Sequence, residues 1–189
     1  LIHFPYPAHP WRVMKVATVV TVHDVIPWIF PEYENGILSH MAHVFSRRSI
    51  HYASRIITVS EFSKSEIIRI LGVPEEKISV IHNGCNEIFF DRSSECPAGE
   101  ECFELQCERP YMLYVGGYDR RKRVTRLVEI FKTFSKECPE AALVLAGKTH
   151  IASDDRVITA GAVDEKKLAC LYRHARMFVH FSEYEGFNI

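Results

Sequence analysis

The segment GGYDRRKR at residues 116–123 combines two glycines with a run of cationic side chains. Gly116 and Gly117 let the backbone approach a ligand closely, and the pattern predicts an amphipathic helix directly after the cations. Helix N-terminal amides and nearby guanidinium or ammonium groups bind phosphate well. The segment therefore predicts an anion site, most naturally for a phosphate or pyrophosphate. The alternative is a solvated basic first turn, which the helix dipole disfavours.

A second segment, SEYEGFN, brings carboxylates and a glycine together near residue 189. Glu183 or Glu185 could contact sugar hydroxyls or a developing positive charge. Gly186, Phe187 and Asn188 could begin a helix whose amides face a phosphate. The alternative is that both glutamates are simply solvated, as most are.

A histidine and an aspartate, His23 and Asp24, follow an apolar run that predicts a strand. A histidine at a strand end is a candidate for contact with a ligand, because ligands gather at the carboxyl ends of parallel strands. The alternative is a structural pair in which Asp24 caps the following turn. Sequence alone leaves the two interpretations equally supported.

Strand-like and helix-like segments alternate along the chain and would position these residues. Apolar runs without alternation predict strands buried on both faces, including the last one. Ser60 and Asp164 are predicted N-caps, and Gly72 is a predicted helix stop. The predicted strands are 16–22, 55–59, 77–81, 111–116, 142–147, 156–161 and 177–181, and the predicted helices are 37–52, 60–71, 124–134 and 164–174.

Such alternation is typical of α/β proteins with parallel sheets and right-handed crossovers. Residues 87–109 break the pattern and predict an interdomain connection between an α/β domain at 1–86 and another at 110–189. In parallel sheets, ligands gather at the carboxyl ends of the strands. The three candidate segments all lie at such ends.

The bulk composition excludes several classes of protein. The 23 basic and 24 acidic residues nearly balance, so no basic field indicates a nucleic-acid partner. The longest apolar runs are far shorter than the roughly 20 residues that span a bilayer. The spacing of Cys96, Cys102 and Cys107 matches no common zinc pattern, so reduced thiols in a cytoplasmic protein are predicted.

Six segments of the chain follow one another in a recognisable order: VVTVHDVIPW, ASRIITVSEFSKSEI, GVPEEKISVIHNGCN, YMLYVGGYDRRKRVTRLVEIF, LVLAGK and GAVDEKKLACLYRHARMFVHFSEYEGFNI. In these segments and their order the chain resembles the retaining glycosyltransferases of family 4, which have the GT-B fold. The resemblance implies two Rossmann-like parallel-sheet domains facing a cleft. It also implies transfer of a sugar, with retention, from a nucleotide-diphosphate-sugar to a glycan or lipid-linked acceptor.

By resemblance, Arg121 and Lys122 would bind the donor diphosphate, with Gly116 and Gly117 beside it. Because these cations would stabilise the leaving group, the family needs no divalent metal and no cofactor beyond the GDP- or UDP-linked donor. Glu185 would hold the donor sugar.

The remaining roles carried over by resemblance belong to four residues. His23 would approach the sugar from the other domain, and the amides around Phe187 and Asn188 would meet phosphate. Asn188 stands where glycine is more usual in the family. The loop that contains Val163 resembles the one beside the nucleotide base.

The resemblance also implies that both domains are incomplete, because the family's second motif glutamate would fall beyond Ile189 and its first strands before Leu1. The chain expressed by itself is therefore expected to be inactive. The resemblance further implies a cytoplasmic location, and it allows peripheral association with the cytoplasmic face of a membrane through the missing N-terminal parts.

Three rival functions make different demands on the sequence. A nicotinamide dehydrogenase should show G-x-G-x-x-G after a strand, and the chain does not. A GT-B sugar-nucleotide epimerase would use the same diphosphate and differ in needing no acceptor. A non-catalytic fragment or binding module is the third.

Overall fold

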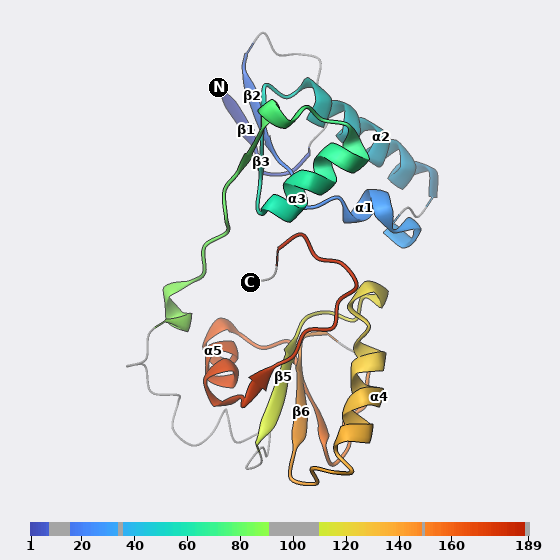
Figure 1. Cartoon of the computed structure of the whole chain (residues 1–189), viewed down its shortest axis with the longest axis vertical. Helices are drawn as coiled ribbons and strands as arrows, with labels where there is room; N and C mark the ends of the chain where they lie inside the picture. Colours follow the sequence, from blue (N-terminus) through green and yellow to red (C-terminus); the bar gives the residue numbers. More distant parts are fainter. Residues whose placement is uncertain (8–15, 34–35, 91–109, 149, 188–189) are drawn as a thin grey trace. The chain divides into compact units, whose positions relative to one another are not determined.

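The computed structural model describes residues 1–7, 16–33, 36–90, 110–148 and 150–187. By its contacts the chain divides into two compact units, Leu1–Gly84 with Glu185–Ile189 and Cys85–Tyr184 (Figure 1). This division assigns the last five residues to the first unit, whereas the sequence suggested one domain over 110–189. Most of the predicted connection at 87–109 lies outside the described residues.

The first unit contains a parallel sheet in the order β1-β2-β3-β4. Strands β2 and β3 are neighbours, so the segments after them share one edge of the sheet. The strands are β1 (Ile2–Phe4), β2 (Thr18–Thr21), β3 (Arg55–Thr58) and β4 (Ile78–Val80), and the helices are α1 (Ile26–Ile29), α2 (Gly36–Tyr52) and α3 (Glu61–Glu66).

The caps predicted for the helix after β3 are confirmed. The Ser60 hydroxyl accepts a hydrogen bond from the Ser63 amide at 2.9 Å. Helix α3 continues into a π-helical turn at Ile67–Leu71, which Gly72 ends in the left-handed conformation at φ 69°. Strand β1 and the short α1 were not predicted, because three or four residues are too few to show a period.

The second unit contains a parallel sheet in the order β7-β6-β5-β8. Asp164 caps α5 by accepting from the Lys167 amide at 2.8 Å, as predicted. The strands are β5 (Tyr111–Val115), β6 (Ala142–Ala146), β7 (Val157–Gly161) and β8 (Met177–Phe178), and the helices are α4 (Val124–Phe134) and α5 (Glu165–His174).

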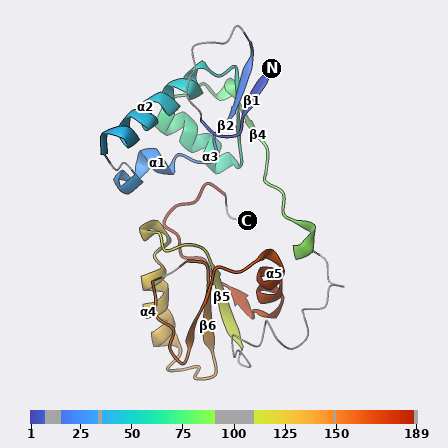
Figure 2. The same ribbon diagram turned by 180° about the vertical axis from the view of Figure 1, so that it is seen from behind.

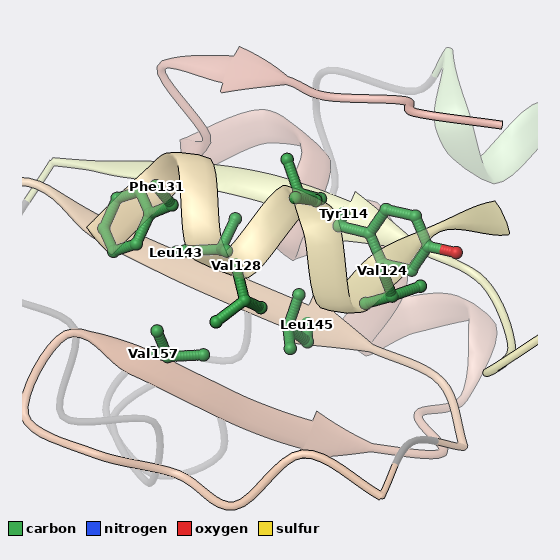
Figure 3. Packing of buried hydrophobic residues seen from close by; sticks show 8 residues of the cluster. Tyr114, Val124, Val128, Phe131, Leu143, Leu145 and Val157 are labelled. Carbon is green, nitrogen blue, oxygen red and sulfur yellow. The ribbon is translucent and has the colours of Figure 1, made fainter. Parts of the chain in front are cut away.

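Strand β6 is covered on both faces, which explains its apolar run without alternation. All five of its residues are buried. Leu143 and Leu145 pack against Val128 and Phe131 of α4 (Figure 3), whereas Val144 packs in a second cluster with Leu171 of α5. The view from behind shows α4 and α5 on opposite sides of this sheet (Figure 2).

Two predictions are wrong. The strand expected as buried at 177–181 is shorter and lies at the sheet edge, where Met177 and Phe178 are 55% and 38% exposed, because an apolar run does not distinguish an edge strand from a central one. Not all thiols are reduced: Cys170 is disulfide-bonded, whereas Cys85 and Cys138 are free.

Candidate functional site

At the carboxyl edge of the second sheet, Gly116 and Gly147 lie in close contact. The Gly116 amide donates to the Ala146 carbonyl at 2.9 Å. A Cβ on Gly147 would lie 2.1 Å from the Gly116 oxygen, and Gly147 has a φ of 124°. Gly147 is therefore required by both its backbone conformation and its neighbour. Sequence reasoning selected Gly116 and Gly117 and missed Gly147, although a glycine directly after a buried strand was a usable signal.

Lys122 lies over this glycine contact. Its Nζ is 3.0 Å from the position that a Cβ on Gly116 would take, and the Tyr114 hydroxyl is 2.8 Å from the same position. The Lys122 side chain is half-buried. Among the described residues, its ammonium has neither a hydrogen-bond nor an ion-pair partner. It is thus available to an anionic ligand at the strand end, where a ligand is expected.

Arg121 is bound to the protein itself. It is only 6% exposed, and its Nη1 donates to the Tyr184 carbonyl. Its backbone carbonyl accepts from the Glu183 amide at 2.9 Å. Its Nη2 lies 3.6 Å from the Asp119 carboxylate. Arg121 therefore fixes the chain at 183–184, a structural role that the sequence did not suggest.

The other two cations of the run have different surroundings. Arg123 pairs with the Glu183 carboxylate at 2.8 Å, with both side chains about half exposed. Arg123 is also the one non-glycine residue with positive φ, at 49°, in the part of the chain that the structure describes. Arg120 is exposed. The structure thus gives different surroundings to four cations that residue type alone did not distinguish.

His23 lies at the carboxyl edge of the first sheet. Its Nε2 is 3.3 Å from the Pro5 carbonyl, and its ring lies 5.2 Å from that of Tyr6. A carbonyl only accepts, so this bond requires the tautomer protonated at Nε2. The Asp24 carboxylate accepts from the Ile26 amide at 3.0 Å, which is the capping role weighed from the sequence.

The segment at 185–187 belongs to the same unit as His23. The Gly186 carbonyl accepts from the hydroxyls of Ser60 and Ser63 at 2.6 and 2.9 Å. The Phe187 ring lies 5.9 Å from that of His82. The structure therefore brings His23 and the neighbours of Glu185 together. Sequence reasoning assigned Ser60 only a capping role and assigned none to Ser63.

The two remaining predicted residues are less informative. Val163 is half-buried and packs against the cluster that contains Tyr111 and Leu113. Asn188 lies outside the described residues.

Within the described residues, no group of three or more His, Cys, Asp or Glu side chains is arranged to hold a metal ion. Of the helices that the structure describes, none is long and apolar enough to cross a membrane.

Two family models match the chain and cover nearly all of it. Residues 1–87 match Glycosyltransferase Family 4, and residues 103–189 match Glycosyl transferases group 1. The chain belongs to the glycosyltransferases with the GT-B fold. This confirms the family and the fold class inferred from the sequence.

Individual proteins are similar over about half of their length. The chain is 29% identical to O-antigen chain mannosyltransferase B of Escherichia coli, with 100% of the chain and 52% of the relative covered. The structure of HepE from Anabaena in complex with UDP and glucose has a TM-score of 0.65 at 18% identity, covering 91% of this chain and 48% of that one. WaaG, a glycosyltransferase involved in lipopolysaccharide biosynthesis, also has a TM-score of 0.65, at 14% identity, with 89% and 51% covered.

Proposed function

We propose that the protein carrying this chain transfers a sugar from a nucleotide-diphosphate-sugar to a glycan or lipid-linked acceptor, with retention and without a divalent metal. The observation that carries the proposal is Lys122, a half-buried residue whose ammonium lies beside Gly116. The mannosyltransferase relative and the UDP-bound neighbour support a nucleotide-sugar donor. We also place the reaction in the cytoplasm.

Each residue has a role in this proposal. Lys122 stabilises the negative charge that develops on the leaving diphosphate, and Arg121 adds positive charge beside it. A preorganised donor or cation of this kind contributes about 3 kcal/mol to lowering the barrier. Glu185 orients the sugar. His23, which belongs to the first unit as Glu185 does, also contacts the sugar. Since side chains neutralise the leaving group, no metal is needed for that step.

A panel of GDP- and UDP-sugars, incubated with the full-length protein, tests the proposal. Nucleotide release that requires an added acceptor and persists in EDTA would support it. Release without any acceptor, with formation of an epimer, would indicate an epimerase instead. Binding of nucleotide-sugars without any turnover would indicate a binding module.

A further inference from the structure

We propose that Ser60 and Ser63 form a reversible docking site for Gly186 that positions Glu185 beside His23 during sugar transfer. The docking rests on geometry alone, and its role in transfer rests on the proposed function. Gly186 is buried, and its carbonyl accepts from the Ser60 hydroxyl at 2.6 Å and from the Ser63 hydroxyl at 2.9 Å. All of these contacts lie within the first unit.

Glycine is required at position 186 because neighbouring atoms leave no room for a side chain, and not because of its backbone conformation. A Cβ there would lie 2.7 Å from the Asp24 Cβ, 2.8 Å from the His23 carbonyl oxygen and 3.0 Å from the Ser63 hydroxyl. The backbone of Gly186 is outside the left-handed region, because the glycines with positive φ do not include it. An alanine at 186 would therefore be unstrained in itself and would oppose only the docking.

The Ser63 hydroxyl explains why the docking is reversible. It lies 3.0 Å from the His23 carbonyl and 2.9 Å from the Gly186 carbonyl, but it has one proton to donate. When Gly186 leaves, Ser63 can donate fully to His23, so no buried donor loses its partner. The half-buried Ser60 hydroxyl then turns to water, and it keeps accepting from the Ser63 amide as the helix cap.

The same hydroxyl links the two candidate groups for the sugar. Ser63 contacts the His23 backbone and the residue next to Glu185, and docking therefore sets the distance between them. Both serines act through other residues and are positioning residues. Their loss should lower turnover and leave affinity for a nucleoside diphosphate unchanged, because the cations of the second unit bind the phosphates.

The decisive variant is Ser60→Asp in the full-length protein. Aspartate caps a helix as well as serine does, and its ionised carboxylate cannot donate to the Gly186 carbonyl. We expect the unfolding temperature to stay near that of the wild type. Amide hydrogen exchange of a peptide covering 185–187 should become about fivefold faster or more, the effect of one neutral hydrogen bond, and kcat should fall by a similar factor. Ser60→Thr keeps both functions and should restore exchange and kcat.

Gly186→Ala should give the same two changes, and Gly84→Ala, where a Cβ meets nothing within 4 Å, is its matched control. Wild-type exchange and kcat in both Ser60→Asp and Gly186→Ala would overturn the proposal. Faster exchange with unchanged kcat would leave a docking contact that does not position the sugar, which also overturns it. A wild-type protein that transfers no sugar contradicts the proposed function instead, and the exchange measurement still decides the docking.

Discussion

The two units hold their candidate groups by different kinds of interaction. In the second unit, cations follow β5 on a short turn, and Arg121 and Arg123 are fixed by a carbonyl and a carboxylate. In the first unit, neutral hydroxyls hold the Gly186 carbonyl beside His23. Charged contacts weaken with salt, and neutral hydrogen bonds depend little on it. Anion binding by the second unit should therefore be sensitive to salt. Docking in the first unit should depend little on salt and should respond instead to the size of the side chain at position 186.

Both units also contain a glycine that admits no side chain, for different reasons. Gly147 has a left-handed-region φ of 124° and touches the Gly116 carbonyl, whereas Gly186 has ordinary φ and only tight neighbours. A substitution at Gly147 must strain the fold, because the contact lies between two strand ends. A substitution at Gly186 can be relieved by undocking. The same change should thus lower stability at one position and activity at the other.

The largest expected effect is that of Gly147→Ala on stability. Adding a Cβ 2.1 Å from the Gly116 oxygen, on a backbone that favours glycine, should lower the free energy of unfolding by about 3 kcal/mol. Urea denaturation monitored by circular dichroism measures it. Gly117→Ala, where a Cβ meets nothing within 4 Å, is the control and should change stability little. Equal losses at both positions would contradict the role of the glycine contact.

The second effect concerns the anion site. Lys122→Ala should weaken binding of a nucleoside diphosphate roughly 10- to 150-fold, since a hydrogen bond to a charged group contributes about 1.5–3 kcal/mol. Nucleoside without phosphate should bind equally to both proteins. Calorimetric titration of the full-length protein at two salt concentrations measures this, and the loss should be larger at low salt.

Arg126→Ala is the control for Lys122. Arg126 is the third residue of α4 and pairs with Glu129 at 2.8 Å, with its side chain 64% exposed. Its removal should leave diphosphate affinity nearly unchanged. Equal losses at Lys122 and Arg126 would indicate a diffuse basic surface in place of a site.

A third effect concerns His23. His23→Ala should lower turnover at least about tenfold, equivalent to about 1.4 kcal/mol of barrier, with nucleotide affinity nearly unchanged. The reason is that His23 lies in the first unit and the proposed diphosphate ligands lie in the second. Steady-state kinetics and nucleotide titration separate the two quantities. A fall in nucleotide affinity would instead assign His23 a structural role through its bond to Pro5.

Local signals made much of the fold predictable. The helix at Gly36–Tyr52, the caps at Ser60 and Asp164 and the stop at Gly72 depend on residues within one or two turns of each other. The amphipathic face of α4 was equally clear from its period. Parallel sheets followed because strands and helices alternate.

Contacts between distant residues were not predictable in this way. No local pattern shows that Arg121 is bound to Tyr184, that Cys170 is in a disulfide, or that Gly186 docks on Ser60. The predicted burial of the strand that contains Met177 was wrong for the same reason, since strand order decides which strand lies at an edge. The candidate residues were found by type and position, but their partners required the structure.

The smallest effect concerns pH and the loop before β7. Burial alone would raise the pKa of Asp154, but hydrogen bonds from the amides of Arg156 and Val157 and the Lys132 ammonium hold it below its ordinary value. A carboxylate with a lowered folded-state pKa stabilises the fold above its unfolded pKa of about 3.9, and that contribution is lost as the pH falls through the folded value. Because the Asp154 side chain is 44% exposed, the contribution is less than about 1 kcal/mol.

Asp154→Asn keeps an oxygen acceptor for both amides and removes the charge that attracts Lys132, which lies 3.0 Å away. Its deficit in unfolding free energy relative to the wild type should be present at neutral pH and should shrink as the pH falls below about 4. Urea denaturation at several pH values measures it, with Asp155→Asn as an equal charge change at the next, exposed residue. A deficit that stays constant with pH would mean that Asp154 acts through the hydrogen bonds of its loop alone. Neutral hydrogen bonds would then stabilise this loop of the second unit, as they hold Gly186 in the first unit.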